Sequence, residues 1–137
     1  MEYTIENDLV LEQHVGTDSV LYITVLGKIS NDRLEQFSTW ADEVKLTIKK
    51  HAEEGENPIL VLTDIRGVVH FERKPIAVLR ELLSYDTQFS IRSAVVGGNR
   101  FAILIFDSII GILHRTNVRH FKDKQSALAW LFAEKHL

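Results

Sequence analysis

The sequence predicts a single α/β domain, and three observations lead to that fold class. Apolar residues spaced by three and four, the period of an amphipathic helix, alternate along the chain with short apolar runs typical of buried strands. The first two predicted strands are separated only by a turn. The chain has 137 residues, the ordinary length of one domain. We therefore expect one domain over residues 1–137, with a mixed sheet of about five strands and four helices.

The N-terminal part of the chain predicts an antiparallel hairpin. Residues 9–11 form a short apolar run, and residues 20–29 form a longer one. Residues 16–19, Gly-Thr-Asp-Ser, are typical of the turn between two strands.

A helix is expected next, because its apolar positions recur at steps of three and four. Those positions are Leu34, Phe37, Ala41, Val44 and Ile48. Asp32, with Glu35 three residues later, predicts a capping box at its N-terminus. The next strand is expected at residues 59–62, an uninterrupted apolar run, and residues 64–67 are expected to close it.

The rest of the chain repeats the alternation of helix and strand. Pro75 is typical of the first turn of a second helix. A strand is expected at residues 94–96, a third helix at 100–115 and a last short strand at 118–121. Asp123 predicts the N-cap of a fourth helix. Strands that alternate with helices favour a largely parallel sheet, to which the opening hairpin adds an antiparallel strand.

Composition excludes several classes of function. The net charge of -3 gives no overall basic field for binding nucleic acid. The absence of cysteine excludes disulfides, thiol catalysis and thiolate metal sites. The six histidines are scattered, no cofactor motif is present, and no metal site or cofactor is expected. The N-terminus lacks the pattern of a signal peptide, no apolar stretch is long enough to span a membrane, and we expect a cytoplasmic protein.

Three stretches resemble one family in their order and spacing. Residues 62–67, Leu-Thr-Asp-Ile-Arg-Gly, look like a strand that ends in Asp-Leu-x-Gly, and residues 92–97 look like the strand after it. Residues 125–131, Gln-Ser-Ala-Leu-Ala-Trp-Leu, resemble a closing phrase of the Glu-Ala-x-x-Trp-Leu type. Over roughly residues 20 to 132 the chain resembles the SpoIIAA-like family, which is related to the STAS domains of anti-sigma-factor antagonists and anion transporters.

The chain departs from that resemblance at one functional position. The resemblance to anti-sigma-factor antagonists implies a phosphorylatable serine at the start of the helix after the Asp-containing strand. Here residues 68–75 read Val-Val-His-Phe-Glu-Arg-Lys-Pro and contain neither Ser nor Thr. We therefore expect that kinases of the related antagonists do not phosphorylate this stretch.

The predicted topology places a candidate ligand cleft beyond the carboxyl ends of the parallel strands. Two adjacent glycines would let the backbone approach a ligand closely, and the N-terminus of the following helix would favour an anion. The candidate binding residues are Asp64, Arg66, His70, Gly97, Gly98, Asn99 and Arg100. The alternative is a turn that requires glycine, with ordinary solvated charges around it.

The predicted third helix carries more apolar surface than one packing contact needs. Its apolar side chains fill an arc of roughly 200°, at about 100° per residue, whereas packing on a sheet needs about 100°. A homodimer partner, neighbouring helices of the same chain, or an apolar ligand or membrane surface would each cover the surplus. The candidate interface residues are Phe101, Ile105, Phe106, Ile109, Ile112 and Leu113.

The sequence therefore favours a non-catalytic regulatory or protein-interaction module that forms a homodimer. No catalytic motif is present. The alternative is a binding protein for a small anionic or amphipathic, lipid-like ligand, which the kinship with lipid-carrying and anion-transporter domains implies. An apolar cavity would favour the ligand, and a surface covered by another chain would favour the interaction module.

Overall fold

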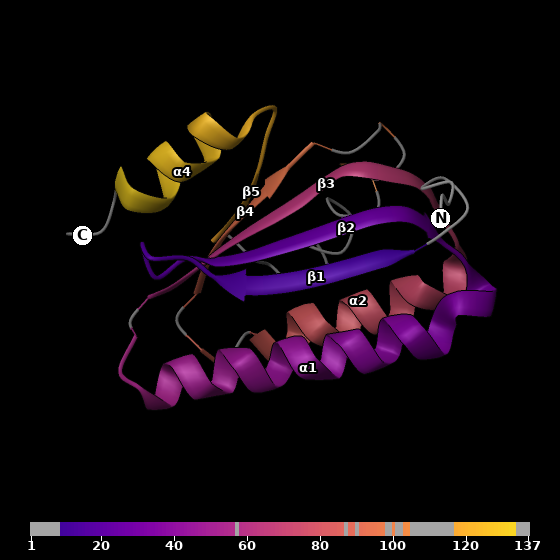
Figure 1. Ribbon diagram of the computed structural model, residues 1–137, viewed down its shortest axis with the longest axis horizontal. Coiled ribbons are helices and arrows are strands. Elements are labelled where there is room, and N and C mark those ends of the chain that lie inside the picture. The colour runs from indigo at the N-terminus through magenta and orange to yellow at the C-terminus, as the bar shows by residue number, and fades with distance from the viewer. Residues whose placement is uncertain are drawn as a thin grey trace, which may run out of the picture.

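The structure is a computed structural model that describes residues 9–56, 58–86, 88–89, 91–97, 100, 103–104 and 117–133. These residues form a five-stranded mixed sheet with helices on both faces (Figure 1). The strands lie side by side in chain order, β1 antiparallel to β2 and all later neighbours parallel. They are β1 (Val10–Val15), β2 (Leu21–Ile29), β3 (Ile59–Phe71), β4 (Ile91–Val96) and β5 (Val118–Phe121). The predicted mixed sheet and N-terminal hairpin are confirmed.

The described residues form three α-helices rather than the four expected. They are α1 (Leu34–Glu53), α2 (Arg73–Asp86) and α4 (Lys124–Ala133). The predicted helix at 100–115 lies outside the described residues except for Arg100, Ile103 and Leu104.

Two apolar cores hold the layers together. The larger core lies between the sheet and α1 with α2, on one face, and the smaller one lies between the sheet and α4, on the other (Figure 1). Alternate residues of β2 supply the first core, because successive side chains of a strand point to opposite faces. Ala127 and Leu131 of α4, one helical turn apart, pack into the second core.

β3 is much longer than the predicted strand at 59–62. It continues to Phe71 because β2 keeps pairing with it, through Leu26 to Gly67 and Ile29 to Phe71. Two irregularities in this ladder insert extra residues into β3. The buried side chains beyond the first segment, Ile65, Val68 and Phe71, are therefore three residues apart and do not show the two-residue period of a strand.

β1 is also longer than expected. The prediction ended the strand at Leu11, whereas the pairing with β2 continues to Val15. The added residues include Glu12, Gln13 and His14, and polar side chains are tolerated there because β1 is an edge strand.

The capping box predicted at Asp32 and Glu35 is wrong. A 3-10 turn, η2 (Asn31–Arg33), precedes α1, and Asp32 accepts a hydrogen bond from the hydroxyl of Ser30 instead of capping the helix. In contrast, the N-cap predicted for the last helix is confirmed, because Asp123 Oδ1 accepts a hydrogen bond from the Ser126 amide over 2.8 Å. Pro75 lies in the first turn of α2, as expected.

Candidate functional site

Three of the predicted cleft residues lie together where β4 ends. Arg66 forms a two-pronged ion pair with Asp64, with Nη2 2.7 Å from Oδ2 and Nε 3.0 Å from Oδ1. The Arg66 amide also donates to Asp64 Oδ1 over 3.0 Å. Gly97 has φ of +81°, and a Cβ there would overlap Cγ of Arg66 and lie 3.0 Å from its Cα. Glycine is therefore required both by the backbone and by the close approach of β3.

The Asp64–Arg66 pair lies within β3, and both of its charges are partly engaged by each other. The hydrogen bonds from Arg66 hold the pKa of Asp64 below its usual range, and the same pair raises the pKa of Arg66. The Arg66 guanidinium already binds a carboxylate through the fork that an anion would use. The arrangement agrees with the alternative prediction, in which the glycine turn is structural.

The other predicted residues do not join this cluster. His70 lies opposite Lys28, near the carboxyl end of β3 and well beyond the end of β4. Arg100 is exposed. Gly98 and Asn99 lie outside the described residues, as do all six candidate interface residues, Phe101, Ile105, Phe106, Ile109, Ile112 and Leu113.

A polar groove of about 520 Å³, the strand-end groove, lies where β2 and β3 end. This is the position, beyond the carboxyl ends of parallel strands, at which ligands of α/β sheets bind. Its walls come from the end of β2, the η2 turn and the end of β3. The lining residues are Lys28, Ser30, Asn31, Asp32, Arg33, His70 and Glu72.

Glu72 fixes the shape of the strand-end groove. One carboxylate oxygen accepts the Asn31 amide over 2.6 Å, and the other lies 3.0 Å from Nε2 of His70. Asn31 in turn accepts the Lys74 amide on Oδ1 over 3.0 Å. The bond from the Asn31 amide, and then that from His70, lower the pKa of Glu72. The starts of α1 and α2 are thus tied to each other and to β3.

The charges in the groove divide into engaged and available groups. Glu72 is held by Asn31 and His70, and Asp32 accepts from Ser30, a bond that lowers the pKa of Asp32. Lys28 is exposed, and no described residue binds its ammonium group. The strand-end groove therefore offers a cation at its rim. Sequence reasoning found only His70 of this set.

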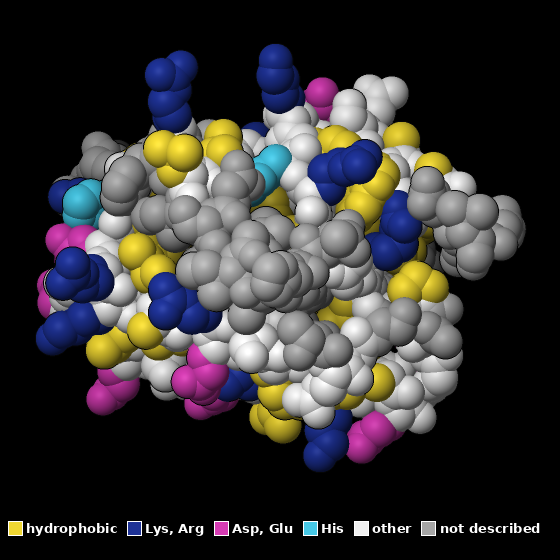
Figure 2. Space-filling model, turned by 180° about the vertical axis from the view of Figure 1, so that it is seen from behind, with side chains coloured by type: hydrophobic (Ala, Val, Ile, Leu, Met, Phe, Trp, Pro, Cys, Tyr) yellow, Lys and Arg dark blue, Asp and Glu magenta, His cyan; other side chains and the backbone are white. Residues whose placement is uncertain are grey.

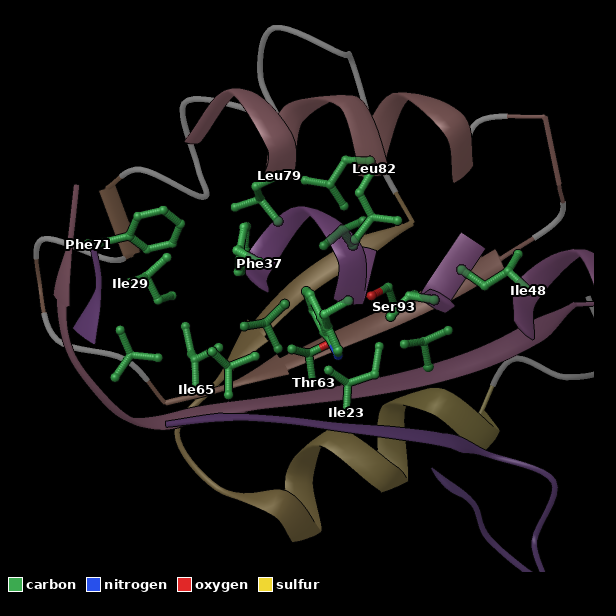
Figure 3. A pocket seen from close by; sticks show the side chains of 18 residues that line it. Ile23, Ile29, Phe37, Ile48, Thr63, Ile65, Phe71, Leu79, Leu82 and Ser93 are labelled. Atoms are coloured by element: carbon green, nitrogen blue, oxygen red, sulfur yellow. The ribbon is translucent and has the colours of Figure 1, made fainter. Parts of the chain in front are cut away.

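A small apolar cavity of about 60 Å³ lies in the larger core, between the sheet and helices α1 and α2. Figure 3 shows Leu79 and Leu82 of α2 reaching toward it from one side, while Ile23, Thr63 and Ile65 reach it from the sheet. Thr63 and Ser93 bring hydroxyl groups to this lining, and neither hydroxyl forms a hydrogen bond with a described residue. The cavity is far smaller than the roughly 300–1,000 Å³ of typical ligand pockets.

On the face opposite the view of Figure 1, the described residues form no single basic stripe. Lys and Arg side chains are spread around this face, with hydrophobic side chains between them (Figure 2). Within the described ranges, no helix is long and apolar enough to cross a membrane. No group of three or more His, Asp or Glu side chains in the same part of the chain is placed to hold a metal ion.

Solved structures share the fold of this chain at low sequence identity. A protein of the DUF3478 family with a SpoIIAA-like fold, from Shewanella loihica PV-4, matches with a TM-score of 0.58 and 20% identity over 96% of this chain and 98% of that one. An anti-sigma factor antagonist from Mycobacterium paratuberculosis matches with a TM-score of 0.58 and 12% identity over 90% and 92% of the two chains.

A third solved structure, of a much longer chain, matches over a part of its length. The structure of SLC26A9 matches with a TM-score of 0.59 and 14% identity, over 85% of this chain and 20% of that one. No curated protein matches this chain. A model of the SpoIIAA-like family matches residues 20–132, which is most of the chain, and the protein therefore belongs to the SpoIIAA-like family.

Proposed function

We propose that this protein is a non-catalytic regulatory module that acts by binding another protein at the strand-end groove. The observation that carries the proposal is the rigid arrangement of charge around Glu72, which binds the Asn31 amide and His70 at the same time. Side chains held in this way are already ordered before a partner arrives, which lowers the entropic cost of binding. The shared fold with an anti-sigma factor antagonist supports a regulatory role.

The partner should present an acidic side chain opposite Lys28, at the rim of the strand-end groove. Both carboxylates of the strand-end groove are engaged within the protein, whereas Lys28 presents a cation at its rim. Complementary charge steers association and selects the partner. No phosphorylation within residues 68–75 is needed for this recognition, because those residues carry no hydroxyl group of Ser or Thr.

Site-directed photo-crosslinking in cells tests this proposal. A photoreactive residue at position 28 should trap a discrete protein partner, because Lys28 is exposed at the groove. The matched control is position 49, since Lys49 is an exposed lysine on α1 outside the groove. The same products at both positions, or no product at position 28, would reject the groove as the binding surface.

A homodimer is part of the proposal. The sequence predicts its interface at Phe101–Leu113, through the six apolar residues named above, and this stays a prediction because those residues lie outside the described ranges. Of Ile105→Glu and Phe106→Glu, one should yield a folded monomer and the other should unfold the domain, because a buried unpaired carboxylate is costly. Light scattering of both variants, with circular dichroism, measures the outcome.

The apolar cavity favours a second candidate function, the binding of a small amphipathic molecule. Its volume of about 60 Å³ exceeds the roughly 10–15 Å³ that one water needs and is below the roughly 150 Å³ that holds benzene. Thr63 and Ser93 would bind the polar end of such a molecule. Short alcohols should then raise the melting temperature more than long-chain fatty acids do, and the reverse order would favour a lipid-like ligand. The Asp64–Arg66 pair gives no support to an anion at the site first predicted.

A further inference from the structure

β1 ends the sheet at one side, and its outer edge pairs with no other strand of the described chain. It is six residues long, and its ladder with β2 runs from Val10 to Val15 without a bulge. Proteins usually protect such an edge with proline, lysine, a bulge or a very short strand. The opposite edge strand, β5, has only four residues. Among the described residues β1 has none of these protections, and its outer edge can accept another strand.

The outward-facing backbone groups belong to the odd-numbered residues of β1. The Gly16 amide donates to the Val20 carbonyl over 2.9 Å, which fixes the phase of the hairpin ladder. Residues of an antiparallel strand alternate between bonding to one neighbour and to the other. Leu11, Gln13 and Val15 therefore direct their N–H and C=O groups away from β2. Their side chains lie on the α1 side of the sheet, because their partners on β2 belong to the core beneath α1.

A groove of about 480 Å³, the edge groove, runs beside β1 on the side of α1. Two buried polar atoms in its lining residues have no hydrogen-bond partner, Oε1 of Gln13 and Nε1 of Trp40. Trp40 is only 7% exposed, so water does not readily satisfy its N–H group. Val15, near the end of the same strand, leaves 46% of its surface exposed. An occupant of this edge must supply apolar side chains together with a hydrogen-bond donor and acceptor.

We propose that the occupant is β1 of a second copy, paired antiparallel about a two-fold axis at Gln13. In this register Glu12 of each copy lies opposite His14 of the other, and Leu11 lies opposite Val15. Carboxylate–imidazole and apolar cross-strand pairs stabilise such a ladder. At the axis the two Gln13 carboxamides face each other. The amide nitrogen of each Gln13 then donates to Oε1 of the other, and each copy brings its Gln13 amide oxygen near Trp40 of the other copy as an acceptor.

The sequence of β1 selects this register over its neighbour. Moving the axis to Glu12 would place two carboxylates opposite each other and set Leu11 against Gln13. Like charges directly opposite destabilise a ladder. With the axis at Gln13, the two five-stranded sheets join into one continuous sheet, and an isologous interface of this kind closes as a dimer.

The β1 interface is an alternative to the helix interface predicted for the homodimer above, and it does not depend on the partner at the strand-end groove. The edge groove and the strand-end groove share no lining residue. Failure of β1 pairing would therefore leave cross-linking at position 28 unchanged, and the two ideas can fail separately.

Gln13→Pro is the sharpest single test. Proline removes an N–H group that points away from β2, so the hairpin keeps its hydrogen bonds while pairing with a second copy is blocked. Light scattering of the whole chain should give twice its mass of 15.7 kDa, and Gln13→Pro should give the monomer. Gln13→Asn retains both the N–H group and an amide, and should remain a dimer. Circular dichroism checks that each variant is folded.

A charge exchange tests the register without proline. Glu12→Lys and His14→Glu should each raise the dimer dissociation constant roughly tenfold: Glu12→Lys removes the carboxylate–imidazole pair, and His14→Glu places carboxylates opposite one another, each twice per dimer. An equimolar mixture of the two variants should form a heterodimer, because Glu12→Lys in one copy then faces His14→Glu in the other. The inference would be overturned if the wild type were a monomer. It would also be overturned if the heterodimer in the mixture had a dissociation constant no lower than that of either variant alone. A dimer that survives Gln13→Pro but is lost in Phe106→Glu would move the interface to the predicted helix and also overturn it.

Discussion

Gly97 is the residue whose identity the structure explains most fully. Its φ of +81° and its contact with Arg66 both exclude a side chain. We expect Gly97→Ala to lower the free energy of unfolding by about 1–3 kcal/mol from backbone strain alone, with a further loss from the clash. Gly55→Ala is the matched control, because Gly55 has φ of +91° but no atom within 4 Å of the added Cβ. Urea unfolding should show a larger loss of unfolding free energy for Gly97→Ala than for Gly55→Ala. Equal losses would mean that the contact with Arg66 does not contribute.

Glu72 gives a pH dependence with a defined sign. Its folded-state pKa lies below its ordinary value of 4.5, first because of the Asn31 amide and then because of His70. Glu72 therefore stabilises the fold at pH values above 4.5, and this contribution is lost as the pH falls through the lower folded-state pKa. Glu72→Gln should be less stable than the wild type at neutral pH, and the two should converge in acid. The control Glu53→Gln, at an exposed position, should be as stable as the wild type at every pH. A difference in stability between the wild type and Glu72→Gln that does not change with pH would contradict this explanation.

The elements differ in how far the sequence predicts them. The helical period from Leu34 to Ile48 and the cap at Asp123 are local signals, and the structure agrees with both. The length of β3 is not a local signal, because the irregularities opposite β2 space its buried residues by three. The strand-end groove depends on that length, so only His70 was found among its residues. The Arg66–Gly97 contact joins distant segments and was likewise beyond sequence reasoning.

The N-cap of α4 offers a test at the scale of one element. Asp123 accepts the Ser126 amide, and this bond holds the pKa of Asp123 below its usual range. Asp123→Ala should lower the free energy of unfolding, whereas Asp123→Asn, which can still cap, should lower it much less. Chemical denaturation of both variants measures the difference. Equal losses would mean that the cap does not stabilise α4.

The cavity between the sheet and α1 with α2 affects the whole molecule. Thr63 brings into this apolar space a hydroxyl that no described residue binds. Thr63→Val keeps the shape of the side chain and removes the hydroxyl, so it should stabilise the fold by about 1 kcal/mol. Thr39→Val, on the exposed face of α1, should have little effect. A destabilised Thr63→Val would instead indicate that the hydroxyl is hydrated or bound.

The fold joins a fixed polar surface to a sheet whose β1 edge pairs with no other described strand. The proposed function rests on the strand-end groove as the surface that binds a regulatory partner. The most direct test is the affinity for the protein cross-linked at position 28, measured by calorimetric titration of wild type, Lys28→Glu and Lys49→Glu. Reversing the charge at the rim of the groove should weaken binding roughly tenfold or more, because an acidic partner would meet a like charge. Lys49→Glu, on the exposed face of α1, should bind as the wild type does. Equal affinities for all three proteins would contradict the claim.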